Sequence, residues 1–414
     1  MIKCIYCCKE KQESEEHVIP AGLGGDDRNW LLEDCVCSDC NTKVFSPLEL
    51  KFLRSSPIAI ARLFMQPYTR NRGAKTGTPT VQPLNSYFAE PETKALLEQE
   101  LLAGGKPHIL PQVVLRPPRE LHLHSADVEE GRAFVSNLNV LLQATLKLVR
   151  KYRDGFENRF EVTVLQWNEA DERYSVEGTP ETSSRSPPDL KSMIWIEALT
   201  PSKLAEENFV LAPRVYQRGG GQVVCKVKDV AHAPVLLSII QPQLSTLVIP
   251  DDAPAVVTEA PGIHQQFSFS MLVHDRVLAK IGMNLCAKIF GADFVRRPEF
   301  DPTREFVRTG QGRILKIPAV DLPEGETSEE QLNHHVFVLT AIALPEEGLR
   351  GLVLQTRLYG GPIEHFLLAK LPESEEALRE TVVVVNDYRQ HLIECRTVAE
   401  WEEVARAQES EELK

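Results

Sequence analysis

The sequence lacks the long apolar segments that a membrane protein needs. No uninterrupted apolar run reaches the ~20 residues of a membrane-spanning helix. The opening residues Met1-Ile2-Lys3-Cys4 also lack the apolar core of a signal peptide. We therefore expect a cytoplasmic protein that does not bind membranes.

Positive charge is also in short supply. The formal net charge of -13 argues against a protein that coats nucleic acid nonspecifically, because neutralising phosphates requires clustered lysine and arginine. The distribution is uneven, however, and residues 50–89 carry no acidic residue. A local basic face is therefore possible on an acidic protein. The basic residues of this segment are Lys51, Arg54, Arg62, Arg70, Arg72 and Lys75.

Cysteines are too few and too unevenly placed for a disulfide scaffold. The chain has nine in 414 residues, and six of them precede residue 41. Such clustering indicates a metal site. The other three, Cys225, Cys286 and Cys395, sit singly within apolar stretches, and we expect them to behave as small buried hydrophobic residues.

What remains is the composition of an ordinary globular protein, 43% hydrophobic and 25% charged. The fold class we predict is α+β. We expect a small N-terminal module with its following helix at 1–65, a helical and strand region at 66–180, and a larger α+β region at 191–414. The linker before this last region is the Ser- and Pro-rich segment 178–190. The N-terminal module is too poor in apolar pattern to build a core of its own.

Hydrophobic periodicity predicts the elements. We expect helices at 48–65 with a break at Pro57, and at 91–102, 126–152, 269–290 and 398–412. We expect strands at 160–167, 193–199, 223–227, 235–240, 336–344, 351–359, 363–371 and 382–385. The last four of these strands should form an antiparallel sheet. His334-His335 opens one strand, and we expect this pair at the surface.

Two C-x2-C knuckles could surround one tetrahedral Zn²⁺ with four thiolates, which would close a small module that lacks a core. Cys8 and Cys35 are alternative ligands, but using either breaks the two-residue spacing of its knuckle. The knuckles consist of Cys4, Cys7, Cys37 and Cys40.

Between the knuckles lie Glu16-His17-Val18-Ile19-Pro20, Gly24-Gly25 and Asn29, and Asn41 directly follows the second knuckle. This order resembles the HNH endonuclease family, whose ββα-metal unit consists of two strands and a helix around a divalent ion. The resemblance covers about residues 1–48. It implies that His17 is the general base and that Glu16 and Asn41 hold the catalytic cation.

The chemistry suits these residue types. Phosphodiester hydrolysis needs a nucleophilic water and a cation on the phosphate. A carboxylate and an amide oxygen suit Mg²⁺ or Mn²⁺, while thiolates select zinc. The resemblance implies that Asn29 orients His17, and Asp34 is the rival for this role.

The resemblance implies an endonuclease that cuts DNA, with bacterial defence against foreign DNA as one setting. Lys43, Lys51 and Arg54 are the candidates for contacts with DNA phosphates, and the C-terminal region could bind a regulatory ligand or a protein partner. The alternative is a zinc-knuckle module that binds nucleic acid or protein without catalysis.

Overall fold

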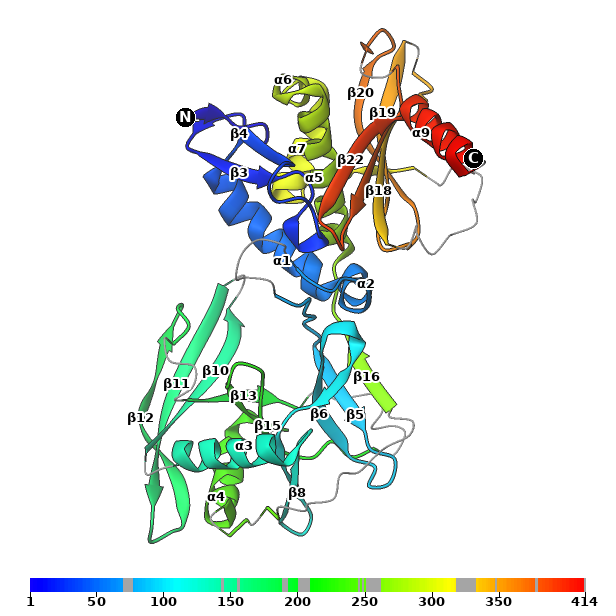
Figure 1. The fold of residues 1–414 in the computed structure, drawn as a ribbon. Coiled ribbons are helices and arrows are strands. Elements are labelled where there is room, and N and C mark those ends of the chain that lie inside the picture. Colours follow the sequence, from blue (N-terminus) through cyan, green and yellow to red (C-terminus); the bar gives the residue numbers. More distant parts are fainter. Residues whose placement is uncertain are drawn as a thin grey trace. The chain divides into compact units, whose positions relative to one another are not determined.

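A computed structural model describes residues 1–69, 77–142, 145–154, 157–187, 193–199, 209–244, 246–247, 249–250, 262–317, 333–346, 348–376 and 379–412. The chain forms two compact units (Figure 1). The first unit contains residues 1–83, 102–106 and 267–414, and the second contains residues 84–101 and 107–266. The fold class is α+β, as predicted.

The units do not follow the predicted boundaries at 1–65, 66–180 and 191–414. Residues 267–414 fold with the N-terminal module, because both contribute side chains to the same hydrophobic core. Residues 178–183 of the predicted linker belong to a strand, whereas residues 188–190 lie outside the described residues. Arg70, Arg72 and Lys75 of the basic segment also lie outside them.

The N-terminal module consists of two short hairpins followed by helices. The second hairpin pairs β3 (Glu13–His17) with β4 (Leu31–Cys37), and η2 (Asp39–Phe45) leads directly into α1 (Ser46–Ser55). Pro57 begins α2 (Pro57–Met65), which confirms the predicted break. The module therefore has the two strands and a helix that the resemblance implies. The first hairpin consists of β1 (Ile2–Lys3) and β2 (Glu10–Lys11).

The central element of the first unit is α5 (Met271–Phe290), which begins and ends close to the predicted bounds. Every residue from Val277 to Ala287 is buried in the core shared with the module and the C-terminal sheet. Figure 1 shows α5 (yellow-green) between the blue module and this sheet (orange and red). The short helices α6 (Ala292–Val295) and α7 (Asp301–Thr309) follow it.

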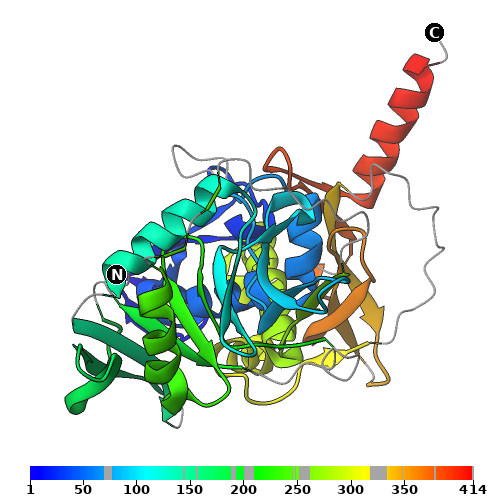
Figure 2. The same ribbon diagram turned by 90° about the horizontal axis from the view of Figure 1, so that it is seen from below.

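The C-terminal sheet has the strand order β17-β20-β19-β18-β21-β22 and is antiparallel, as predicted. Helix α9 (Val398–Glu412) leads away from its end (Figure 2). The strands are β17 (Leu315–Lys316), β18 (His334–Ala343), β19 (Leu349–Arg357), β20 (Glu364–Pro372), β21 (Val382–Asp387) and β22 (Leu392–Thr397).

This sheet holds the loop that follows His17. His335 is fully buried, which corrects the surface position expected for it. Its Nε2 lies 3.1 Å from the carbonyl oxygen of Leu23, and the Asn386 side chain donates to the same oxygen at 3.4 Å. Gly24 has φ +77, and a Cβ there would lie 2.6 Å from Tyr388, so this close approach requires glycine.

The second unit is built on a mixed sheet with the strand order β12-β11-β10-β13-β15-β14-β8-β9. Helices α3 (Val128–Leu141) and α4 (Ala233–Leu244) pack on one of its faces (Figure 2). The strands are β8 (Gln112–Arg116), β9 (Glu120–His124), β10 (Thr145–Asp154), β11 (Glu157–Asn168), β12 (Arg173–Ser183), β13 (Ile194–Ala198), β14 (Arg214–Gln217) and β15 (Val223–Val227).

A smaller sheet in this unit has the order β16-β5-β6-β7. Three of our predictions fail in the second unit. Residues 91–102 form no helix but contain β6, residues 235–240 are helical in α4, and the helix expected at 126–152 ends at Leu141 and gives way to β10. The small strands are β5 (Asn85–Ala89), β6 (Leu96–Leu101), β7 (Pro107–Ile109) and β16 (Gly262–Gln266).

Among the described residues, no helix combines the length and the apolar character that crossing a membrane would take.

Burial of His335 predicts a specific dependence of stability on pH. Burial lowers the pKa of His335 from 6.5 to about 3. The unfolded chain therefore binds a proton between pH 6.5 and 3 that the folded chain does not, so stability falls as the pH is lowered through this window. We expect the free energy of unfolding to drop by roughly 2 kcal/mol more between pH 7 and pH 5 in the wild type than in a His335→Gln variant. Urea unfolding at the two pH values measures this difference, and equal drops would contradict it.

Candidate metal centre

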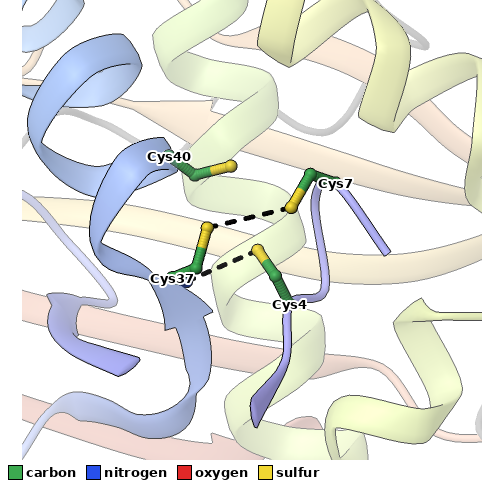
Figure 3. Close-up of side chains that lie close together, drawn as sticks. All are labelled: Cys4, Cys7, Cys37 and Cys40. Atoms are coloured by element: carbon green, nitrogen blue, oxygen red, sulfur yellow. Dashed lines mark hydrogen bonds between the residues drawn. The ribbon is translucent and has the colours of Figure 1, made fainter. Parts of the chain in front are cut away.

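Four cysteine thiols meet at the point where the two ends of the N-terminal module come together (Figure 3). Their Sγ atoms all lie within 4.8 Å of one another, and the Sγ atoms of Cys7 and Cys37 are 3.8 Å apart. The backbone also ties the knuckles together, because the Ile5 N–H donates to the carbonyl oxygen of Cys35 at 2.8 Å. The predicted cluster is thus confirmed: Cys4, Cys7, Cys37 and Cys40.

The surroundings of Cys4 favour a thiolate. Its hydrogen bond with the Cys40 thiol and the backbone N–H groups pointing at its sulfur outweigh burial and lower the pKa of Cys4 to about 4. The N–H groups of Tyr6 and Cys37 both lie 3.4 Å from this sulfur. The same hydrogen bond raises the pKa of Cys40.

The donor set fits zinc. Four cysteine thiolates are the ligands of closed structural zinc sites, and no His, Asp or Glu side chain joins the group among the described residues. Cys8 is exposed and Cys35 is partly buried, and neither belongs to the group. The spacing argument therefore selected the right cysteines.

Asn41 lies against β3, the strand that carries Glu16 and His17. Its Nδ2 donates to the Ser14 Oγ at 3.0 Å and to the carbonyl oxygen of Glu15 at 2.7 Å. The local helix is of the π type, in which the Ser46 N–H donates to the carbonyl oxygen five residues earlier, that of Asn41. This wide turn at the start of the helix brings Asn41 to the strand.

Glu16 has a partner that the sequence does not suggest. The residue is only 3% exposed, and its Oε1 accepts a hydrogen bond from the Lys280 ammonium. Lys280 is fully buried and also pairs with Glu49 of α1 at 2.5 Å. Burial lowers the pKa of Lys280, but the carboxylates of Glu16 and Glu49 outweigh it and raise the pKa overall. The ammonium therefore stays charged.

The Glu16 carboxylate does not fit a divalent cation in this arrangement. Burial raises the pKa of Glu16 to about 7, the Lys280 ammonium opposes this shift, and Glu49 adds to it. A carboxylate that holds Mg²⁺ must be ionised and open to the ion and to the substrate phosphate. Glu16 is not open to solvent, and its carboxylate is already paired with the Lys280 ammonium.

His17 ends β3 and is partly exposed, in contrast to Glu16 beside it. Successive side chains on a strand point to opposite faces, which accounts for the difference. Asn29, which we predict to orient His17, is exposed, and its side chain donates to Asp26 at 2.9 Å. Its rival Asp34 is exposed and shares a hydrogen bond with Glu13 that raises the pKa of Glu13. The choice between Asn29 and Asp34 stays a prediction.

The three candidates for DNA contacts are all exposed. Lys43 is paired with Asp39 at 2.5 Å. Lys51 and Arg54 lie three residues apart on α1, which places them on neighbouring turns of its solvent face.

A second group of possible metal ligands was missed by the sequence analysis. His274, Asp275 and Glu364 bring ligand atoms within 4.8 Å of one another in the first unit. The ammonium of Lys316 lies 2.7 Å from Asp275 and 3.0 Å from Glu364, so a cation is already present between the carboxylates. No sequence spacing links these residues, because they come from α5, β17 and β20.

The comparison with protein families gives one match within the module. Residues 4–56 match the model described as HNH endonuclease, and this segment contains both knuckles, β3, β4, η2 and α1. The comparisons with curated proteins and with solved structures gave no match. The match thus indicates a nuclease-type module and leaves residues 57–414 outside it.

Loss of one thiolate should open the module locally. We expect Cys37→Ser to lose its zinc and to become sensitive to protease within residues 1–45, because four thiolates complete the site. Metal analysis and limited proteolysis measure these changes. Cys8→Ser is the matched control, since Cys8 is exposed beside the cluster, and it should keep about one zinc per chain. Full metal content and protease resistance in Cys37→Ser would contradict the four-cysteine site.

Proposed function

We propose that the module at residues 4–56 is a metal-dependent endonuclease that hydrolyses phosphodiester bonds in DNA, with His17 as its general base. The observation that carries the proposal is the position of His17. It is partly exposed at the end of β3, within a thiolate-closed ββα unit whose segment matches HNH endonucleases.

The role of His17 follows from its chemistry. A neutral imidazole accepts a proton from the water that attacks phosphorus, and histidine titrates near neutral pH. The backbone of His17 is fixed, because its carbonyl oxygen accepts a hydrogen bond from Asn284 Nδ2 at 2.9 Å. The C-terminal sheet holds the following loop at Leu23. A base on a fixed strand end can be delivered to one position over the phosphate.

A divalent cation, Mg²⁺ or Mn²⁺, belongs to this proposal through the resemblance and would neutralise charge on the phosphate. Asn41, whose side chain lies against β3, is its proposed ligand. Glu16 would have to leave Lys280 to join it.

DNA is the proposed substrate because exposed cations lie on the helix of the same unit. Lys51 and Arg54 on α1 are available to phosphates, and Lys43 is available once it leaves Asp39. The acidic remainder of the chain limits nonspecific binding.

Residues 267–414 are built into the core that supports the module. We therefore assign recognition of a regulatory ligand or protein partner to the second unit, which has its own core. We propose cytoplasmic defence against foreign DNA as the setting, which the resemblance suggests.

The second candidate is a zinc-knuckle module that binds nucleic acid or protein without catalysis. The buried pair between Glu16 and Lys280 favours it, because this pair occupies the carboxylate that the HNH resemblance assigns to the catalytic cation.

Replacing the base should separate the two candidates. We expect wild-type protein to nick supercoiled plasmid in the presence of Mg²⁺ or Mn²⁺, and His17→Ala to be slower by about 10²- to 10⁴-fold, the usual contribution of a general base. Nicking rates measured at equal zinc content give the comparison.

His232→Ala is the matched control, since His232 is an exposed histidine of the second unit and should cut like the wild type. Equal nicking by His17→Ala would remove His17 from the mechanism. Plasmid that stays intact with every protein and both cations, but is retarded in a gel, would support the binding module.

A further inference from the structure

Helix α5 contacts the candidate site through three polar side chains spaced four residues apart. Residues at this spacing lie along one face of a helix, one turn after another. Each of them reaches a different part of the segment that carries the predicted catalytic residues. The contacts are Lys280 to Glu16, Asn284 to the carbonyl oxygen of His17, and Lys288 to the carbonyl oxygens of Asn29 and Leu31.

Lys280 is fully buried. Its ammonium lies between the carboxylates of Glu16 and Glu49 and 5.3 Å from the ring centre of Phe45, so module residues surround it. Its exposed fraction is 0%. Removing one partner of such a pair leaves a buried charge without compensation, which is strongly destabilising.

Asn284 uses both ends of its amide. Its Oδ1 accepts from the Tyr6 hydroxyl at 2.6 Å, while its Nδ2 donates to the His17 carbonyl oxygen at 2.9 Å and lies 3.5 Å from Glu16 Oε1. Opposite requirements at the two ends fix the orientation of the amide. The backbone at Glu16 and His17 is thus held from the side of α5.

We propose that Glu16 is the buried anchor through which α5 positions His17, and that it is not a ligand of the catalytic cation. The proposal rests on the proposed function of His17. The Glu16 carboxylate is already neutralised by an ammonium that has no exposed surface. A divalent ion at the same carboxylate would be repelled by this ammonium and would lack a path to a phosphate in solvent. Glu16 and Lys280 are therefore positioning residues.

The experiment compares Glu16→Met, Lys280→Met and the double variant. Glu16→Met leaves the buried Lys280 ammonium with Glu49 alone, and Lys280→Met leaves the buried Glu16 carboxylate without a cation. The double change replaces this pair by apolar side chains of similar volume and leaves only Glu49, whose side chain is 21% exposed. We expect each single variant to lower kcat about tenfold with an unchanged KM for DNA, because the base is displaced while the phosphate contacts remain. The double variant should recover to within about threefold of the wild type, with the same half-saturating concentration of Mg²⁺ or Mn²⁺.

Two further measurements distinguish a loss of stability from a displacement of His17. Thermal unfolding of the four proteins gives the coupling between the two positions, and the NMR signals of the His17 ring report its position directly. Lys288→Met is the matched control, because it removes another lysine of the same helix face that contacts the module without touching Glu16. It should leave the coupling of the other two positions unchanged.

The outcomes are distinct. Folded Glu16→Met and double variants that are both inactive, or that both need much more Mg²⁺, would make Glu16 a metal ligand and overturn the proposal. If the wild type itself does not cut DNA, the proposed function fails. The positioning role of Glu16 is then tested by thermal unfolding and by the NMR signals of His17. Additive losses of thermal stability, or His17 signals that the single variants leave unchanged, would then overturn the anchor. Coupled losses, with His17 signals that move in the single variants and return in the double variant, would support it.

Discussion

The contact on which the first unit depends is the burial of the Lys280 ammonium between Glu16 and Glu49. An unpaired ammonium in a protein core is very costly, so α5 can lie in this core only with the two carboxylates of the module against it. The carboxylates in turn can be buried only with α5 in place. Residues 264 positions apart in the chain are therefore placed by one another.

Because the module shares a core with α5, zinc has a smaller part in its folding than in an isolated zinc module. A module of about 48 residues without apolar pattern would need its metal to fold at all. Here the module contributes Val18, Leu32 and Phe45 to a core completed by α5 and the C-terminal sheet. The four thiolates then close only the tip, where the first knuckle meets the second. The cysteine cluster thus holds one end of the module and the shared hydrophobic core holds the rest, and β3, which carries His17, lies between them.

The sequence predicted the features that depend on local spacing. The two C-x2-C knuckles, the break at Pro57 and the amphipathic pattern of α5 are each set by residues within a few turns, and all three were located correctly. Short apolar runs were ambiguous, and residues 235–240 were assigned to a strand although they are helical in α4.

Long-range polar partners explain the other errors. Residues 91–102, which include the carboxylate of Glu98, were predicted to form a helix. In β6 this carboxylate is buried and paired with Lys226 of β15 at 3.0 Å. The position of Glu16 escaped the sequence analysis for the same reason. The available signal was Lys280, together with Asn284, within the otherwise apolar stretch from Val277 to Ala287 of α5. An unpaired charge is rarely found in such a place.

A motif records which residue types follow one another, whereas the chemistry of a carboxylate is decided by what surrounds it. Glu16 is followed by the histidine that the HNH pattern requires, yet its carboxylate is already paired with the Lys280 ammonium. Lys280 is tethered by a packed helix and needs no diffusion to arrive, so it competes for the carboxylate at an effective concentration far above that of a free ion. Successive side chains on a strand point to opposite faces, so His17 does not share the environment of Glu16. Within this dipeptide, Glu16 is buried in the core and His17 stays partly exposed.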